Sequence, residues 1–559
     1  MEAPRDPFER LYRIGVELAA ERNRDRLVER ILVSAKDFCR ADGGTIYLLE
    51  DQVLRFAIVR TDSLGIAFGG TEAEPPPMPP VPLYEADGRP NTRNVVSAAV
   101  HAQESVNIAD AYDAEGFDFS GTKAFDARNG YRSTSLLAIP MRNAEGRVIG
   151  VLQLLNAREG GKDVPFSAAS QEAVEALAFQ AAIALDNQQL LHQQKRLLDA
   201  FIQLIAAAID AKSPYTGGHC RRVPELTKML MGAVCAAREG PFASFELDDD
   251  GWYELHIAAW LHDCGKITTP VHVMDKSKKL ETIHDRLEGV LTRLAVLGEE
   301  ARRTLAGDPE RLSMRLGELE DAGRFLEQVN VGGEAMADQD LARLRALASW
   351  EWTDHRGHRQ VLLSEDELAN LSVRKGTLTQ EERLVINGHM VETIRMLEAL
   401  PFPPQLARVP EYAGGHHEKM NGGGYPKGLF AGDMSVPARA MAIADVFEAL
   451  TAHDRPYKPG MSLSRAMGIM GRMKVDNHVD PELFDLFVKS GVYRRYAEIH
   501  VDPAQLDEVD EAALLALRPN SLRLPEDDER AQRWEGFLPE YEAVARTASY
   551  AAPKEGEST

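Results

Sequence analysis

The residues of this chain that could do chemistry are histidines and aspartates in four separated segments of its second half. Each segment sets them beside a signal for the start or end of a local element. The segments are SPYTGGHCRRVPEL, WYELHIAAWLHDCGK, TQEERLVINGHMVETIRML, and GHHEKMNGGGYPKG with PARAMAIADVFEALTAHDRPYKP after it. Imidazole and carboxylate donors without thiolates suit iron or manganese, although zinc and nickel accept the same donors. A metal centre is one interpretation of this pattern, and solvated or hydrogen-bonded side chains in each segment are the other.

In the second segment, His262 and Asp263 lie at the end of an apolar helical stretch, where polar side chains most need a partner. Gly265 stands where a helix C-cap is expected, with Lys266 after it. An ionised aspartate at the end of an apolar helix needs a partner, either a buried cation side chain or a metal ion. Asp445, in an apolar helical run, needs one for the same reason. An adjacent His and Asp can ligate one ion together, or the carboxylate can bridge two ions.

The remaining histidines are weaker candidates when each is taken alone. His219 is predicted at a helix entrance, because a glycine pair ends the preceding element and Pro224 suits the first turn of the next. His389 lies on the border of an apolar helical stripe, where a satisfied core-edge histidine is the usual outcome. His416 and His417 precede three glycines, which a plain surface turn would also contain.

Size and composition limit the classes of protein that fit. A chain of 559 residues exceeds what one core usually supports, so two or three domains are expected. Its 44% hydrophobic and 27% charged residues are typical of a soluble globular protein, and no apolar run approaches the ~18 residues that span a bilayer. The charged N-terminal stretch lacks the apolar centre of a secretory signal, which predicts a cytoplasmic protein without membrane insertion.

Charge and cysteine content limit the kinds of binding partner and the kinds of cysteine site that the chain can have. A net charge of -23 disfavours binding to a nucleic acid polymer or an anionic membrane, so a phosphate substrate would need a local positive site that bound cations could supply. The four cysteines are scattered without CxxC spacing, which argues against a disulfide framework or a thiolate zinc site.

The first 175 residues have the pattern of an α+β unit. Helical spacing runs from about Phe8 to Ala35, and GTIYLLEDQVLRFAIVR then alternates as two strands joined by an acidic turn. STSLLAIPMRN and VIGVLQLLNAR, separated by the turn AEGR, predict a second antiparallel pair.

A long helix is predicted to follow, because no Pro or Gly occurs from Ser170 to Ala211. We assign 176–211 as a linking helix. An apolar residue recurs every seven positions at Ile183, Leu190, Leu197 and Leu204. A parallel homodimer through this helix is one interpretation. The other interpretation is an ordinary amphipathic helix packed on its own domain. It is supported by the polar residues Asn187 and Gln194, which occupy the second position of each seven-residue repeat that a partner helix would have to cover.

Residues from about 10 to 190 resemble a GAF domain, in ESVNIADAYDAEGF, NGYRSTSLLAIPMRNAEGRVIGVLQLLN and PFSAASQEAVEALAFQAAIAL. The resemblance implies a sensory or dimerising module over 1–175 with a small-molecule ligand of unknown identity, and a purely structural role is the alternative. Of the Asn-Lys-Phe-Asp-Glu signature of cyclic-nucleotide-binding members, the chain keeps Asn156 and Phe166. It has Ala157, Ser170 and Gln171 at the other places, which speaks against a cyclic nucleotide as that ligand.

The chain from about Asp210 to Gly491 resembles the HD-GYP branch of the HD-domain metal-dependent phosphohydrolases. The shared motifs are GGHCRRV, HDCGKI, NGHMVETIRML, HHEKMNGGGYPKGL and IADVFEALTAHDRPYK, in the family's order. The fold implied is an all-α domain over 212–500. The chain departs from the family in a long insertion at about 277–375, where the helical spacing of 280–305 and 339–352 predicts a helical hairpin. A peripheral segment with a disordered tail follows over 501–559.

The resemblance also implies roles for individual residues. The metal ligands would be His219, His262, Asp263, His389, His416, His417 and Asp445, with Asp263 catalytic as the bridge between ions. Lys266, Arg455 and Lys458 would surround the scissile phosphate, with Lys266 catalytic as well, and Gly424, Tyr425 and Pro426 would border the substrate cleft. For each of the three cations, a solvated surface side chain is the alternative.

Two divalent ions, iron or manganese, are expected, because Tyr215 replaces the glutamate of members with three. Such a pair lowers the pKa of water and stabilises charge during in-line attack on phosphorus. The implied function is hydrolysis of cyclic di-GMP to linear pGpG and onward to GMP, under control of the GAF-like domain. A weakly active cyclic di-GMP receptor and a general HD-type nucleotide phosphohydrolase are the alternatives. Asn421 stands where the family usually has an acid, and Glu448 stands where the family usually has aspartate.

Overall fold

The computed structural model describes residues 7–72, 74–212, 218–332, 335–452, 460–522 and 537–545. The chain divides into two compact units, Met1–Leu198 and Asp199–Thr559, and each is considered by itself. Within the described ranges, no helix has both the length and the apolar character needed to span a membrane.

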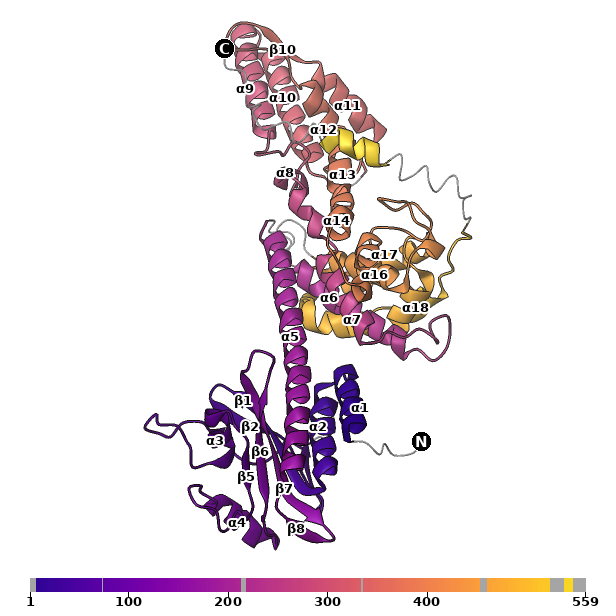
Figure 1. Cartoon of the computed structure of the whole chain (residues 1–559). Coiled ribbons are helices and arrows are strands. Elements are labelled where there is room, and N and C mark those ends of the chain that lie inside the picture. Colours follow the sequence, from indigo (N-terminus) through magenta and orange to yellow (C-terminus); the bar gives the residue numbers. More distant parts are fainter. Residues whose placement is uncertain are drawn as a thin grey trace. The chain divides into compact units, whose positions relative to one another are not determined.

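An antiparallel sheet forms the centre of the first unit, with strand order β3-β2-β1-β7-β6-β5, β4 beside β2 and β8 beside β7 (Figure 1). The strands are β1 (Ala41–Glu50), β2 (Val53–Thr61), β3 (Ile66–Gly69), β4 (Val81–Pro82), β5 (Val106–Ile108), β6 (Leu136–Arg142), β7 (Val148–Glu159) and β8 (Lys162–Val164). Asp51 and Gln52 join β1 to β2 and both have positive φ, 45° and 72°, as a two-residue hairpin turn requires. Both predicted strand pairs are present.

Helices cover both faces of this sheet. They are α1 (Pro7–Ala20), α2 (Arg24–Cys39), α3 (Val95–Ala102), α4 (Ser120–Asn129) and the start of α5 (Ala168–Lys212). One core joins α1, α2 and α5 to one face through side chains such as Leu18, Ile31 and Leu177, and a second core packs α3 on the other face. Because both faces are covered, β6 is buried along almost its whole length. The predicted α+β fold and the long helix are confirmed.

The second unit is helical. Outside the insertion its elements are α6 (His219–Ala236), α7 (Asp249–Leu261), η1 (Cys264–Thr268), α8 (Val271–Met274), α13 (Gln380–Asn387), α14 (His389–Glu398), η2 (Pro404–Leu406), α15 (Val409–Gly414), η3 (Ala431–Asp433), α16 (Val436–Thr451), α17 (Leu463–Val475), α18 (Pro481–Lys489), α19 (Val492–His500), η4 (Pro503–Gln505) and α20 (Glu511–Ala516). A further helical stretch covers 537–545. The helix α6 packs against α7 and α16.

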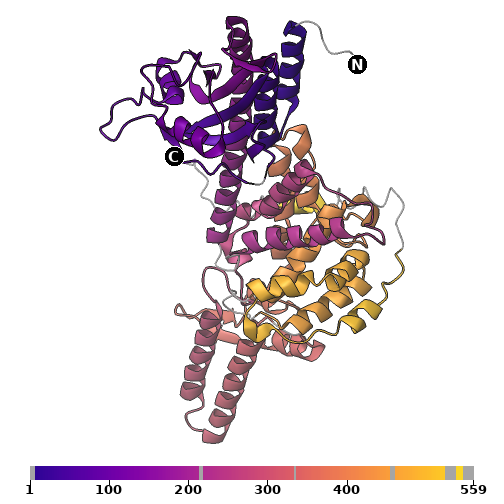
Figure 2. The same ribbon diagram turned by 90° about the horizontal axis from the view of Figure 1, so that it is seen from below.

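The insertion has a core of its own. Its elements are α9 (Leu287–Thr304), α10 (Pro309–Asn330), α11 (Asp338–Ala348), β9 (Glu351–Thr353), β10 (Arg359–Val361) and α12 (Glu365–Leu371). A hairpin is present, and Figure 2 shows it as α9 beside α10. The predicted first helix, 280–305, contains α9, but the predicted second helix, 339–352, corresponds to α11, and α10 was not predicted. Periodicity marks an amphipathic helix but does not say which neighbour covers its apolar face.

Two local predictions were wrong. Pro224 lies inside α6 and not in its first turn. Gly265 is not a C-cap, because α7 ends at Leu261 and Gly265 belongs to η1. A Cβ at position 265 would lie 2.0 Å from the His389 carbonyl oxygen, so this glycine is needed for the close approach of α14.

Candidate metal centre

Seven side chains from five places in the fold meet at one buried site. They come from the start of α6, the end of α7, the start of α14, the segment after α15 and the middle of α16. They form two groups that share one carboxylate: His219, His262, Asp263 and Asp445 in the first group, and Asp263, His389, His416 and His417 in the second. Within each group the candidate ligand atoms lie within 4.8 Å of one another. The sequence-predicted ligand set is therefore brought together without exception.

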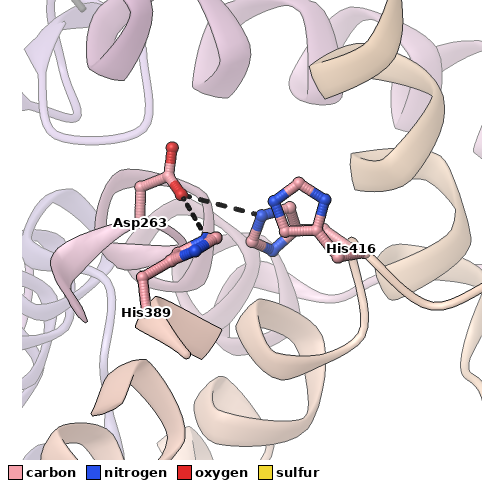
Figure 3. A group of neighbouring side chains, drawn as sticks. Asp263, His389 and His416 are labelled. Atoms are coloured by element: carbon pink, nitrogen blue, oxygen red, sulfur yellow. Dashed lines mark ion pairs between the residues drawn. The ribbon is translucent and has the colours of Figure 1, made fainter. Parts of the chain in front are cut away.

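Asp263 is the common member of the two groups because each of its oxygens faces a different one. Its Oδ2 lies 3.2 Å from Nε2 of both His219 and His262. Its Oδ1 lies 3.3 Å from Nε2 of His389 and 3.8 Å from Nε2 of His416 (Figure 3). Asp445 closes the first group with Oδ1 3.2 Å from His219 Nε2. This placement suits a bridging carboxylate.

Three of the imidazoles are oriented by the same local device. Nδ1 of His262, His389 and His416 lies 2.5–2.7 Å from the carbonyl oxygen three residues earlier. A carbonyl oxygen can only accept, so the proton is on Nδ1 and the lone pair of Nε2 faces the site. Each of these histidines lies one or two residues past the end of a helix, where backbone carbonyls lack helical partners.

The site has the properties that a cation requires. Among the described residues, Nε2 of His219, His262, His389 and His416 and Oδ1 of Asp263 are buried without a hydrogen-bond partner of good geometry. Buried polar atoms rarely stay unsatisfied, and here they point at shared positions. Imidazole nitrogens and carboxylate oxygens are also the donors that first-row divalent metals accept. The residues present therefore fit divalent ions.

The electrostatic environment of the His/Asp cluster favours a bound positive charge. Burial acts against protonation of His219, but the charge of Glu448 and the neighbouring carboxylates of Asp263 and Asp445 outweigh it and raise its pKa well above the usual value. The pKa of Asp263 is well below its usual value, since Lys266 and His262 more than compensate for burial. Burial lowers the pKa of His416 to about 4, so this imidazole is neutral and available as a ligand at neutral pH.

Glu448 and Arg222 support His219 from outside the ligand set. Glu448 was recognised in the sequence as a departure from the family's usual acid that could alter metal affinity, whereas Arg222 was not singled out. Oε2 of Glu448 lies 2.5 Å from Nδ1 of His219, and its Oε1 accepts hydrogen bonds from Arg222 at 2.6–2.7 Å. Glu448 lies one helical turn after Asp445 on α16, so both carboxylates face α6. The sequence signals for Glu448 were this spacing from Asp445 and its place in the family's motif, whereas Arg222 gave no such signal.

The glycine loop after His417 is shaped by a buried glutamate. Glu418 accepts hydrogen bonds from the backbone N–H groups of Lys427, Gly428 and Leu429 at 2.7–3.1 Å. A Cβ at Gly424 would lie 2.4 Å from Cα of Glu418, so only glycine lets the loop close over it.

This loop places Tyr425 beside the site. The Tyr425 ring stacks on the His417 ring with centroids 4.9 Å apart, and the peptide bond before Pro426 is cis. Burial raises the pKa of Tyr425, which keeps its phenol protonated.

Of the three cations predicted to bind phosphate, the structure describes only Lys266. Lys266 extends its Nζ to 2.6 Å from Asp263 Oδ2 and so lies at the edge of the site. Arg455, Lys458 and Tyr215 fall outside the described residues. The histidines of WTDHRGHRQ lie in the turn between β9 and β10, away from the cluster.

Fold and site together define the class of protein: an antiparallel-sheet domain joined by a long helix to a helical domain with a buried His/Asp cluster. Family models match both halves, the GAF domain at residues 23–185 and the HD domain at residues 365–483. The chain therefore contains a GAF domain and an HD domain. The HD match covers the elements from α12 to α18, and α6 and α7 precede it.

Curated relatives share a smaller part of the chain. It is 38% identical over 117 residues to 3'3'-cGAMP-specific phosphodiesterase 1 of Vibrio cholerae, which covers 21% of this chain and 26% of that protein. It is 35% identical over 137 residues to a cyclic di-GMP phosphodiesterase of Pseudomonas aeruginosa, which covers 24% and 32%. The matched part thus spans between a quarter and a third of these relatives.

Solved structures resemble the chain over about a third of its length. The GAF domain of an Acinetobacter phosphoenolpyruvate-protein phosphotransferase is 18% identical, with 34% of this chain and 99% of that chain covered and a TM-score of 0.26. A GAF domain/HD domain protein of Geobacter sulfurreducens is 15% identical, with 32% and 98% covered and a TM-score of 0.21. The domain assignment depends on the family models.

Proposed function

We propose that this chain is a metal-dependent phosphodiesterase of the HD-GYP branch that opens cyclic di-GMP to linear pGpG, with GMP as the product of a second cut. The observation that carries the proposal is the pair of His/Asp groups that share Asp263. Two adjacent sites with a common carboxylate suit chemistry at a phosphorus centre. The phosphodiesterase names of the relatives from Vibrio and Pseudomonas support the same class of substrate.

The cluster would hold two divalent ions, and iron or manganese suits its donors better than zinc does. When bound, such a pair supplies an activated water molecule and stabilises the charge that develops on phosphorus. The chain's own residues orient the imidazoles through Nδ1, keep His416 neutral at pH 7 and concentrate negative charge at Asp263 and Asp445. Lys266 at the edge of the cluster would bind a phosphate oxygen; its Nζ lies beside Asp263, and its side chain is partly exposed.

A homodimer formed along α5 is part of the proposal. Leu190, Leu197 and Leu204, seven residues apart, are 53%, 57% and 64% exposed. An apolar row at this spacing favours a parallel partner helix. In such a dimer the exposed Asn187 of each copy would lie face to face in the interface between the two α5 helices. Signals from the GAF domain would then reach the HD domain through this helix.

The test is to load the purified chain with Fe²⁺ or Mn²⁺ without oxygen, add cyclic di-GMP, and follow pGpG and GMP by chromatography together with metal content per chain. 3'3'-cGAMP and guanosine tetraphosphate form parallel arms on the same preparation. Turnover of a cyclic dinucleotide is expected. Binding without product would identify a receptor instead, and preferential hydrolysis of guanosine tetraphosphate would identify a general HD-type phosphohydrolase.

A further inference from the structure

The last turn of α5 contacts two of the segments that carry the first group of candidate ligands, namely η1 after Asp263 and the turn before His219. Nζ of Lys212 donates to the carbonyl oxygens of Lys266, Ile267 and Thr269, with distances of 3.3 Å to Lys266 and 2.6 Å to Thr269. Oδ2 of Asp210 accepts a hydrogen bond from the backbone N–H of Gly218 at 3.1 Å.

The Lys212 contact holds η1, the turn that follows Asp263. Carbonyl groups at the end of a helix carry partial negative charge, so an ammonium group with three N–H donors matches them; the Lys266 carbonyl also accepts the N–H of Thr269. The same turn carries Lys266, whose Nζ binds Asp263, and Gly265, whose N–H donates to Oγ1 of Thr393 on α14. A shift of η1 would therefore move Asp263 and the start of α14 together.

The Asp210 contact holds the entrance of α6. Gly218 precedes His219 and has a φ of 82°, and Asp210 accepts the N–H of this turn. An acceptor at a helix N-terminus is favourable, because the first N–H groups have no helical partner. Asp210 and Lys212 thus fix the two backbone segments from which His219 and Asp263 project.

We propose that Asp210 and Lys212 are positioning residues that couple α5 to the metal centre. A rotation or axial shift of α5 would change the placement of η1 and of the α6 entrance, and with them the distance between His219 and Asp263. This proposal deepens the proposed function by naming how the linking helix regulates its site. The expected consequence is that metal affinity depends on the state of a helix that supplies no metal ligand.

The experiment compares full-length variants. Lys212→Met removes the ammonium at similar length, Lys212→Arg keeps cationic donors, and Asp210→Asn keeps an acceptor without the charge. Arg196→Met is the matched control, because Arg196 is an exposed cation on the same helix. The readouts are Mn²⁺ affinity by chelator competition, the Mn²⁺ electron paramagnetic resonance spectrum, and amide exchange of residues 264–269 in metal-free protein.

Lys212→Met is expected to weaken Mn²⁺ binding about tenfold, change the spectrum and speed exchange at 264–269, as loss of an outer-sphere partner of a metal site does. Lys212→Arg should restore affinity to within about threefold, Asp210→Asn should lie between, and Arg196→Met should match wild type. Unchanged affinity, spectrum and exchange in Lys212→Met would overturn the proposal. A wild-type chain that binds Mn²⁺ but leaves cyclic di-GMP intact would reject the proposed activity, while these readouts would still decide the coupling.

A double-mutant cycle tests transmission along α5. Leu190→Ser with Leu197→Ser disturbs the exposed apolar row, and its effect on Mn²⁺ affinity is measured with and without Lys212→Met. If Lys212 transmits the disturbance, the effect shrinks in the Lys212→Met background. Full additivity of the two changes, or no effect of the serine pair on affinity, would show that Lys212 is not the route.

Discussion

Replacing Glu448 by Gln should weaken metal binding although the residue is placed outside the ligand set. The Glu448 side chain is 1% exposed, and its two oxygens accept from His219 on one side and Arg222 on the other. Glutamine has the same shape but only one acceptor oxygen. Its NH₂ group must therefore face a donor, either Nδ1–H of His219 or the guanidinium of Arg222.

Both orientations have a cost that can be bounded. If the amide NH₂ faces His219, the imidazole is driven to the tautomer with its proton on Nε2, which is the atom that points at Asp263 and Asp445. Loss of such an orienting partner typically lowers metal affinity about 10- to 100-fold, or about 1.4–2.8 kcal/mol. If the NH₂ faces Arg222, a hydrogen bond between charged groups is lost, which destabilises the fold by about 1.5–3 kcal/mol.

The assay measures Mn²⁺ affinity by chelator competition and unfolding free energy of the metal-free protein in urea. Glu482→Gln is the matched control, because Glu482 is an exposed glutamate at the start of another helix of the same unit. Wild-type affinity together with wild-type stability in Glu448→Gln would refute the orienting role.

The same variant has a defined pH signature. Burial opposes ionisation of Glu448, but the charges and hydrogen bonds of His219 and Arg222 outweigh it and lower its pKa from 4.5 to about 2. A carboxyl group with a depressed pKa contributes stability above its unfolded pKa, and this contribution is lost as pH falls through the folded pKa. Wild-type unfolding free energy should therefore fall more steeply than that of Glu448→Gln between about pH 5 and pH 3. Parallel pH profiles of the two proteins would contradict the assigned pKa shift.

Three further outcomes are expected. Asp263→Ala removes the carboxylate shared by both groups, so metal content and hydrolysis should be lost while the GAF domain stays folded by circular dichroism; near-normal metal content would exclude the bridging role. Tyr541→Ala deletes a ring that is 7% exposed and that packs so closely on Gly388 that a Cβ there would lie 1.9 Å from it. Amide exchange at 537–545 should therefore rise without global unfolding. Unchanged exchange would show that this ring does not hold the 537–545 helix in place. Leu190→Ser with Leu197→Ser should convert a dimer to a monomer in light scattering, and an unchanged mass would reject the α5 interface.

The parts of the fold that follow from local rules were predictable. The β1–β2 and β6–β7 pairs could be recognised because alternation and turn residues lie next to each other in the chain, and α5 because no helix breaker interrupts it. Gly265 was misassigned because its role depends on the His389 carbonyl, which a distant helix brings to it. The importance of Tyr541 was missed for the same reason, since nothing near it in the sequence indicates α14.

The candidate ligands could be predicted as a set, but their orientation has two different origins. His262, His389 and His416 each use the carbonyl three residues earlier, so a histidine just past a helix end already determines its own tautomer. His219 instead takes its Nδ1 partner from Glu448 on α16, an element far away in the sequence. The site therefore contains three locally oriented imidazoles and one that depends on tertiary packing. Substitutions that separate α6 from α16 should impair the first group before the second, because only the first contains His219.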